Sequence, residues 1–387
     1  MALATAALSL LLVPAITPTA QASDANGQRV TVMTRNVYLG VDIQRPIRAT
    51  AGKTGAAALV ALGNASHTMG EIVDQTNFPL RSKLLAAEIA RTKPDLIGLQ
   101  EVALWRSGPI ELPPTGAVGV PNATHVDYDF LQILLDELRA TGVSYRAVSV
   151  QNESDVEAPS FLGNPFTGTM TDPSDRRLTM RDAILVRDQA PLTIVDHGSG
   201  QYDARLSLNV GGVPAAFVRG YNWADVRSGS KTFRFINTHL EAFSSDLALA
   251  QTAELLKGPA DYDGTTILAC DCNSDPLNNT VKPTDPLRTP HSGPYNLITG
   301  SGFADEWLNW APASQGWTSG LSEAVTDATA VDFDHRIDMV FARGAKRSGL
   351  KVDAGEITGN EVSDRDPTTG LWPSDHAGVV LTLRGLR

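Results

Sequence analysis

Apolar runs rich in β-branched residues recur along this chain, and they outnumber the segments with a helical pattern. We expect strands at residues 29–36, 95–101, 145–150, 182–188, 192–198, 215–226, 232–240, 265–273, 336–343 and 377–384. Helices are expected at residues 77–95, 127–142 and 245–257, where apolar side chains recur at helical spacing. Some strands follow one another directly and others are separated by helices. The pattern predicts an α/β protein whose sheets pack on each other and are covered by helices.

The first 22 residues differ from the rest of the chain. They form an apolar run followed by prolines and the small-x-small sequence Ala20-Gln21-Ala22, although the Lys or Arg usual at the start of a signal peptide is absent. We expect a secretory signal at residues 1–22, a secreted protein and one catalytic domain at residues 23–387. No 18-residue apolar run follows, so no transmembrane segment is expected.

Composition restricts the partners of the chain. Its 387 residues carry a net charge of −11, and no Lys/Arg run is visible. This balance argues against tight nonspecific binding of nucleic acid through electrostatics alone. It does not exclude a nuclease, because a bound divalent cation supplies positive charge locally.

The chain contains two cysteines, Cys270 and Cys272. On a strand both would point to the same face, and a disulfide between residues two apart is strained. No further Cys or His lies nearby at zinc-site spacing. We expect two packed thiols that face the core, while the interleaved Asp271 and Asn273 face a cleft.

Polar residues gather at the carboxyl ends of five predicted strands, where ligands commonly bind in α/β folds. These residues are Asn36, Glu101, Asn237 with His239, Asp271 with Asn273, and Asp375 with His376. Oxygen ligands from Glu101, Asp271 and Asp375 favour Mg²⁺ or a similar cation over zinc. Histidines can transfer protons or stabilise developing charge. The set suits hydrolysis at phosphorus.

Six short motifs occur in an order that resembles a known family: MTRNV, GLQEV, INTHL, CDCNS, RIDMVF and PSDHAGV. The chain is similar in these motifs to the endonuclease/exonuclease/phosphatase superfamily, which includes deoxyribonuclease I, abasic-site endonucleases, bacterial sphingomyelinases and inositol-polyphosphate phosphatases. The resemblance implies a four-layer α/β sandwich with two packed, mostly antiparallel sheets flanked by helices. One departure is Cys270, which stands where the family usually has glycine before the aspartate.

The resemblance also implies roles for individual residues. Metal ligands would be Glu101, Asn36 and Asp375, holding Mg²⁺ or another divalent cation such as Mn²⁺ or Ca²⁺. Catalytic residues would be Asp271, His239, His376 and Asp338, with Asp338 paired to His376. Asn237 and Asn273 would bind the substrate. Outside the motifs, Arg181 is a further candidate for phosphate contact, although an exposed salt bridge explains it equally well.

We therefore expect a secreted, metal-dependent phosphodiesterase. We favour phospholipid or glycerophosphodiester headgroups, cleaved in the manner of a phospholipase C or sphingomyelinase. An extracellular endonuclease resembling deoxyribonuclease I and a catalytically silent phosphate- or membrane-binding relative are the alternatives. No obligate protein partner is evident. Segments 40–74, 106–125 and 152–177 look like long loops that shape substrate access, or equally like tolerated surface insertions.

Overall fold

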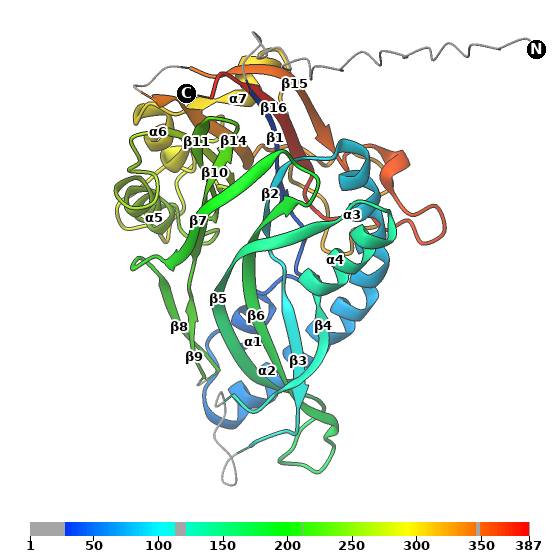
Figure 1. Cartoon of the computed structure of the whole chain (residues 1–387). Helices are drawn as coiled ribbons and strands as arrows, with labels where there is room; N and C mark the ends of the chain where they lie inside the picture. Colours follow the sequence, from blue (N-terminus) through cyan, green and yellow to red (C-terminus); the bar gives the residue numbers. More distant parts are fainter. Residues whose placement is uncertain (1–27, 113–120, 212, 346–348, 387) are drawn as a thin grey trace, which may run out of the picture.

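The protein folds as a four-layer α/β sandwich, in which two large sheets pack face to face and helices cover their outer faces (Figure 1). The computed structural model describes residues 28–112, 121–211, 213–345 and 349–386. The expected fold class is confirmed. The predicted signal peptide, residues 1–22, lies outside the described residues.

The first sheet has the strand order β15-β16-β1-β2-β6-β3-β4, with β5 paired to β6. Strands β1 and β2 run parallel, and the other described pairs of this sheet are antiparallel. Its strands are β1 Arg29–Asn36, β2 Leu96–Gln100, β3 Leu104–Gly108, β4 His125–Asp129, β5 Tyr145–Leu162, β6 Thr171–Arg187, β15 Lys351–Thr358 and β16 Gly378–Arg384.

The second sheet has the order β13-β14-β12-β11-β10-β7, and here β11 and β12 are the parallel pair. Its strands are β7 Leu192–Gln201, β10 Gly220–Ser228, β11 Lys231–His239, β12 Thr265–Asp271, β13 Ala304–Asp305 and β14 Asp338–Arg343. A separate hairpin joins β8 Leu206–Val210 to β9 Val213–Phe217.

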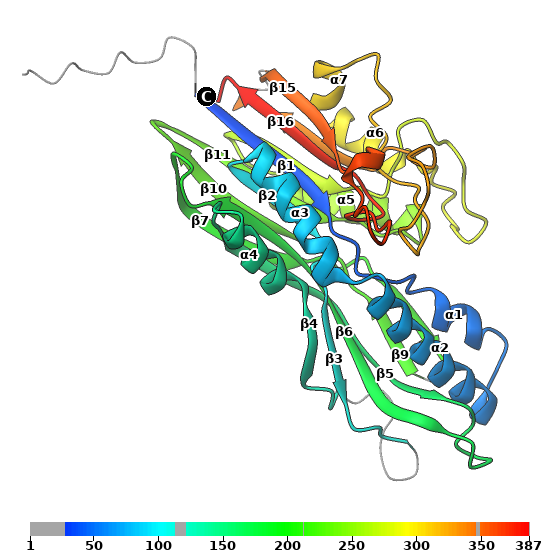
Figure 2. The same cartoon turned by 90° about the vertical axis from the view of Figure 1, so that its right-hand side faces the viewer.

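Helices complete the two outer layers (Figures 1 and 2). On the first sheet lie α3 Phe78–Thr92 and α4 Phe130–Ala140, while α2 Gly55–Gln75 continues along β5. On the second lie α5 Ser245–Lys257 and α6 Gly293–Gly300. The short elements are α1 Arg45–Thr50, α7 Glu306–Trp310 and the 3₁₀ turn η2 Val362–Asp364. No helix among the described residues is long and apolar enough to cross a membrane.

Five hydrophobic clusters form among the described residues, and the three largest hold these layers together. Between the sheets, Val30 and Leu96 of the first pack with Phe235 and Ile267 of the second, all fully buried. A second core lies under α3 and α4, and a third lies under α5 and α6. Because burial of apolar surface is the main favourable term in folding, these cores fix the strand ends relative to one another.

The expectation of three long loops is wrong for most of the residues in these segments, because they form helices and strands. Segment 40–74 contains α1 and most of α2, and segment 152–177 lies largely in the long β5–β6 hairpin. Helix α2 is rich in Ala and Gly, so few large apolar residues mark its buried face. Strands β5 and β6 carry many polar residues along their outer halves, several of them buried in the folded protein, which hides their strand pattern in the sequence. Of segment 106–125, residues 113–120 lie outside the described part.

Candidate functional site

The ends of β1, β2, β11 and β12 meet at one rim of the two packed sheets. This follows from the two parallel pairs, in which Asn36 lies opposite Gln100 and His239 lies opposite Asp271. A cleft of roughly 340 Å³ opens at this rim. The polar residues that line it are Tyr38, Asp42, Glu101, Arg219, His239, Asp271, Asn273, Glu323, Asp375 and His376. The structure thus brings most of the sequence-predicted site residues together.

Asp271 lies at the base of the cleft and is almost fully buried. The Asn36 side-chain amide donates to its Oδ2 at 3.0 Å, and the backbone N–H of Asn273 donates to its Oδ1 at 3.0 Å. Burial, followed by the neighbouring Asp338 carboxylate, raises the pKa of Asp271 to about 7. A fixed carboxylate with this pKa suits a group that accepts a proton near neutral pH.

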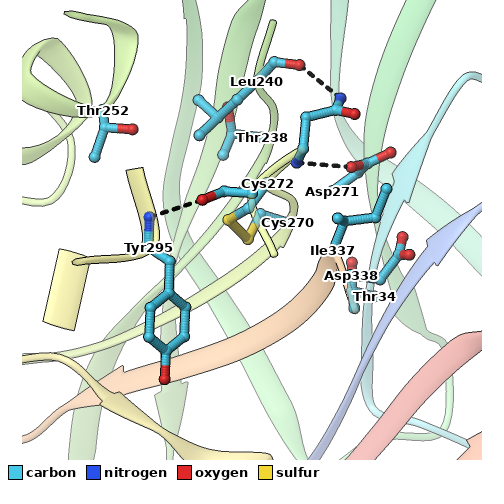
Figure 3. The surroundings of a disulfide bond; sticks show 12 residues. Thr34, Thr238, Leu240, Thr252, Cys270, Asp271, Cys272, Tyr295, Ile337 and Asp338 are labelled. Atoms are coloured by element: carbon cyan, nitrogen blue, oxygen red, sulfur yellow. Dashed lines mark hydrogen bonds between the residues drawn. A yellow bond between two sulfur atoms is a disulfide. The ribbon is translucent and has the colours of Figure 1, made fainter. Parts of the chain in front are cut away.

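The expectation of two free thiols is wrong, because Cys270 and Cys272 form a disulfide (Figure 3). Strand β12 ends at Asp271, and the Cys272 N–H still bonds to Ile337 O in the register of β14, so the bend between the cysteines shows in the spacing of their Cα atoms. Their Cα atoms lie 5.1 Å apart, within the usual disulfide range. Residues two apart in a regular strand lie roughly 6.5 Å apart. Both cysteines are buried in the core, and Asp271 points away from them.

His376 pairs with Asp338, as expected from the sequence. Its Nδ1 lies 2.8 Å from Asp338 Oδ2, and its Nε2 lies 4.0 Å from Asp375 Oδ1. Burial opposes the charged ring, but the carboxylates of Asp338 and Asp375 outweigh burial and raise the pKa of His376 well above its usual value. The ring is therefore an imidazolium at neutral pH, able to donate from Nε2.

His239 has the opposite environment. Its Nδ1 lies 3.0 Å from Nη1 of Arg219, and its Nε2 lies 3.4 Å from Asp271 Oδ2. A guanidinium can only donate, so Nδ1 accepts and Nε2 carries the proton. Burial and then the Arg219 charge lower the pKa of His239 well below its usual value. His239 is thus a neutral ring that carries its proton on Nε2, 3.4 Å from Asp271 Oδ2.

Arg219 is a site residue that the sequence reasoning missed. Its side chain is 3% exposed, and Nη1 lies 3.6 Å from Oε2 of the buried Glu153. Burial alone would lower the pKa of Arg219, but Glu241 and Glu153 raise it. The only feature of the sequence that could have indicated it is that Arg219 is a single charged residue, between Val218 and Gly220, in an otherwise apolar run.

The oxygen donors of the cleft fit a hard divalent cation. Glu101 lies at its edge, where Oε2 accepts from the Leu39 N–H at 2.8 Å. Burial and the charge of Glu101 raise the pKa of Asp375 to about 6, against the lowering effect of His376. Ligand atoms of Asp271, Asp338 and His376 lie within 4.8 Å of one another. Asp338 Oδ1 is buried with no hydrogen-bond partner among the described residues, so this oxygen can accept a further donor or contact a cation.

Four of the predicted site residues do not line the cleft: Asp338, which pairs with His376, and three others that lie behind the cleft wall. Asn36 is fully buried, and its Oδ1 accepts from the Tyr38 N–H at 2.9 Å while its amide holds Asp271. Asn237 is buried between the sheets and donates to Leu99 O at 3.0 Å. Arg181 donates to Val102 O and to Asp129, in a largely buried contact. The geometry gives none of the three direct access to a ligand in the cleft.

Asn273, the remaining predicted substrate-binding residue, lines the cleft. One of its amide N–H groups donates to Leu240 O at 2.9 Å. Its backbone has φ 43°, in the left-handed region that asparagine tolerates better than most residues. The side chain is therefore held at the cleft by the bend that follows β12.

Comparison with solved structures identifies the fold. An endonuclease/exonuclease/phosphatase family protein from Leptotrichia buccalis C-1013-b aligns with a TM-score of 0.52 at 15% identity, over 92% of this chain and 100% of that one. A family protein from Bacteroides thetaiotaomicron gives 0.50 at 14%, over 92% and 98%. Caenorhabditis elegans TDP2 gives 0.48 at 16%, over 94% and 100%. No protein-family model and no curated protein matches the chain.

Proposed function

We propose that this chain, which has the endonuclease/exonuclease/phosphatase fold, is a divalent-metal-dependent phosphodiesterase. The proposal rests on one cleft that brings together Glu101, Asp375 and Asp271. The same cleft holds two histidines, one with a lowered pKa and one with a raised pKa. Oxygen donors for a hard cation, a candidate base and two N–H donors are the groups that hydrolysis at phosphorus requires.

We assign the cleft residues separate roles in hydrolysis: metal binding, proton acceptance and hydrogen-bond donation to the phosphate. When bound, a divalent cation held by Glu101 and Asp375 supplies positive charge that offsets the charge of the phosphate. Asp271, with its carboxylate fixed by Asn36 and Asn273, accepts a proton from the attacking water. The imidazolium of His376, oriented by Asp338, and the Nε2–H of His239 donate to phosphate oxygens.

Within this class we favour a phospholipid or glycerophosphodiester substrate over a nucleic acid. The net charge is −11, and Arg219 is the one Lys or Arg among the described residues that line the cleft. Its guanidinium already contacts His239 and Glu153. An extended polyanion needs a basic track along its backbone, whereas a single headgroup phosphate does not. The apolar start of the chain, residues 1–22, supports secretion as part of the same proposal.

A substrate panel tests the proposal. The purified protein is incubated with phosphatidylcholine, sphingomyelin, glycerophosphocholine and plasmid DNA, in Mg²⁺ or EDTA. The comparison variants are His376→Ala and, as a matched control, His125→Ala, which removes an exposed histidine outside the cleft. We expect headgroup release that needs both the metal and His376 but not His125. Nicked plasmid with intact lipids would establish the nuclease instead. No hydrolysis of any substrate would favour the remaining alternative, a catalytically silent relative that binds phosphate or a membrane.

A further inference from the structure

A second cavity lies behind the wall of the cleft, lined mainly by residues of α1, α2, β5, β6 and the β8–β9 hairpin. Its volume is roughly 100 Å³. The lining is almost entirely apolar and includes Leu62, Met69, Met180, Val213 and Ala215, all buried. We refer to this cavity as the apolar pocket.

The apolar pocket adjoins the catalytic cleft. Ile43 lines both of them. Phe217 of the pocket meets Phe243 of the cleft edge-on, with ring centroids 5.2 Å apart. Trp105 of the pocket donates from Nε1 to Leu39 O of the cleft wall at 2.9 Å. A group that extends from a ligand in the cleft would therefore need to pass only one layer of side chains.

The outer edge of the pocket comes from α1 and the turn before it. Ile43, Pro46 and Ile47 are only partly buried there. Arg45 of α1 pairs with Glu323, which also lines the cleft. The turn before α1 thus borders both spaces through Ile43, and Arg45 ties α1 to the cleft wall.

The size and lining of the pocket limit its occupant. It is smaller than the cavity of about 150 Å³ that holds one benzene molecule. A peptide segment or a nucleobase is too large, and a nucleobase also carries polar edges that this lining could not satisfy. A few methylene groups of an alkyl chain fit in size and in polarity.

We propose that the apolar pocket receives part of an alkyl chain of a phospholipid-type phosphodiester whose phosphate lies in the adjacent cleft. The proposal rests on the phosphodiesterase function and specifies its substrate class. A nucleic acid has no group that would use this pocket.

Filling the pocket tests the proposal. Ala215→Phe places a ring in the pocket, and Ala216→Phe adds the same ring on the opposite face of β9 as a control. The substrates are dihexanoylphosphatidylcholine and bis(p-nitrophenyl) phosphate, which has no alkyl chain. We expect Ala215→Phe to lower kcat/KM at least 10-fold on the first and less than twofold on the second. Equal losses on both substrates would overturn the proposal. Val213→Met is the milder variant if Ala215→Phe does not fold.

A binding measurement separates this inference from the proposed function. Propane is titrated into protein with ¹³C-labelled methionine methyl groups, since Met69 and Met180 line the pocket. We expect the signals of these two methyl groups to shift in the wild type and not in Ala215→Phe. Unchanged wild-type signals would overturn the inference. If the wild type hydrolyses no phosphodiester, the proposed function fails, and the propane titration alone decides whether the pocket takes hydrocarbon.

Discussion

The two cleft histidines differ because their Nδ1 atoms face opposite charges. His376 Nδ1 meets the Asp338 carboxylate, and His239 Nδ1 meets the Arg219 guanidinium. The first contact favours an imidazolium and the second favours a neutral ring with its proton on Nε2. Both rings can therefore donate toward the cleft, which leaves Asp271 as the group that accepts a proton from water.

The pairing of His376 with Asp338 predicts a graded loss of activity. His376→Ala removes the donor and should lower kcat by about 10²- to 10⁴-fold. Asp338→Asn keeps the ring but weakens its charge and orientation, so its loss should be smaller. Steady-state kinetics on bis(p-nitrophenyl) phosphate measure both. Activity within threefold of wild type in His376→Ala would remove this residue from the mechanism.

The contact between Arg219 and His239 predicts a single tautomer. In ¹⁵N NMR of the histidine rings, His239 should show a protonated Nε2 and an unprotonated Nδ1 at neutral pH. Arg219→Gln should release this constraint, whereas Arg219→Lys, which still only donates, should keep it. A protonated Nδ1 in the wild type would contradict the assignment.

The sequence motifs predicted most of the chemically important residues of the cleft, but not every residue that lines it. Residues that bear the chemistry, such as Glu101, Asp271 and His376, stand at strand ends in a recognisable order. Arg219 has no such mark, since its partner Glu153 lies in another strand and the contact exists only after folding. Asn237 and Arg181 carry suitable groups, but the sequence could not reveal that both are buried behind the cleft.

At the scale of elements, the bend after β12 decides the position of Asp271. The Cys270–Cys272 disulfide closes this bend around the aspartate. Replacing both cysteines with alanine should lower the free energy of unfolding by about 1–2 kcal/mol, the amount expected for closure of so short a loop. Urea unfolding measures the change, and reducing agent should destabilise the wild type but not the variant. Equal unfolding midpoints for both proteins without reductant would contradict the prediction.

Helix α7 carries a buried acid that makes stability depend on pH. Burial raises the pKa of Glu306 to about 7. Because the unfolded chain releases this proton at lower pH than the folded protein does, the free energy of unfolding falls as pH rises from about 4.5 to about 7. Glu306→Gln should therefore be more stable than wild type at pH 8, by about 1–3 kcal/mol, with a smaller gain at pH 5.

Thermal or urea unfolding across this pH range measures the gain. Glu137→Gln, at a half-exposed position on α4, is the matched control and should show no such trend. A gain from Glu306→Gln that is the same at pH 5 and pH 8 would show that its carboxyl group does not titrate differently in the folded state.

Elements with clear periodicity could be predicted from the sequence, and the others could not. The expected strand at 29–36 and the helix at 245–257 match β1 and α5 residue for residue. The expected helix at 127–142 begins later, at Phe130, because residues 125–129 pair as β4 with β3. Strand pairing between distant segments, like the bend that brings the two cysteines together, is a tertiary property that local patterns do not encode.

At the scale of the whole molecule, the two parallel strand pairs create the site. Parallel pairing of β1 with β2 and of β11 with β12 turns four strand ends toward one rim. The core between the sheets then holds residues as distant in sequence as Asn36 and Asp271 at 3.0 Å. The same architecture leaves room beside the rim for α1, α2 and the apolar pocket.

Metal-dependent hydrolysis of a phosphodiester is the central claim, and one measurement tests it most directly. Protein stripped with EDTA is titrated with Mg²⁺ while hydrolysis of bis(p-nitrophenyl) phosphate is followed, for wild type and Glu101→Gln. We predict no activity without metal, saturable recovery in the wild type, and recovery in Glu101→Gln only at much higher Mg²⁺. Full activity in EDTA, or identical titration curves for the two proteins, would contradict the account.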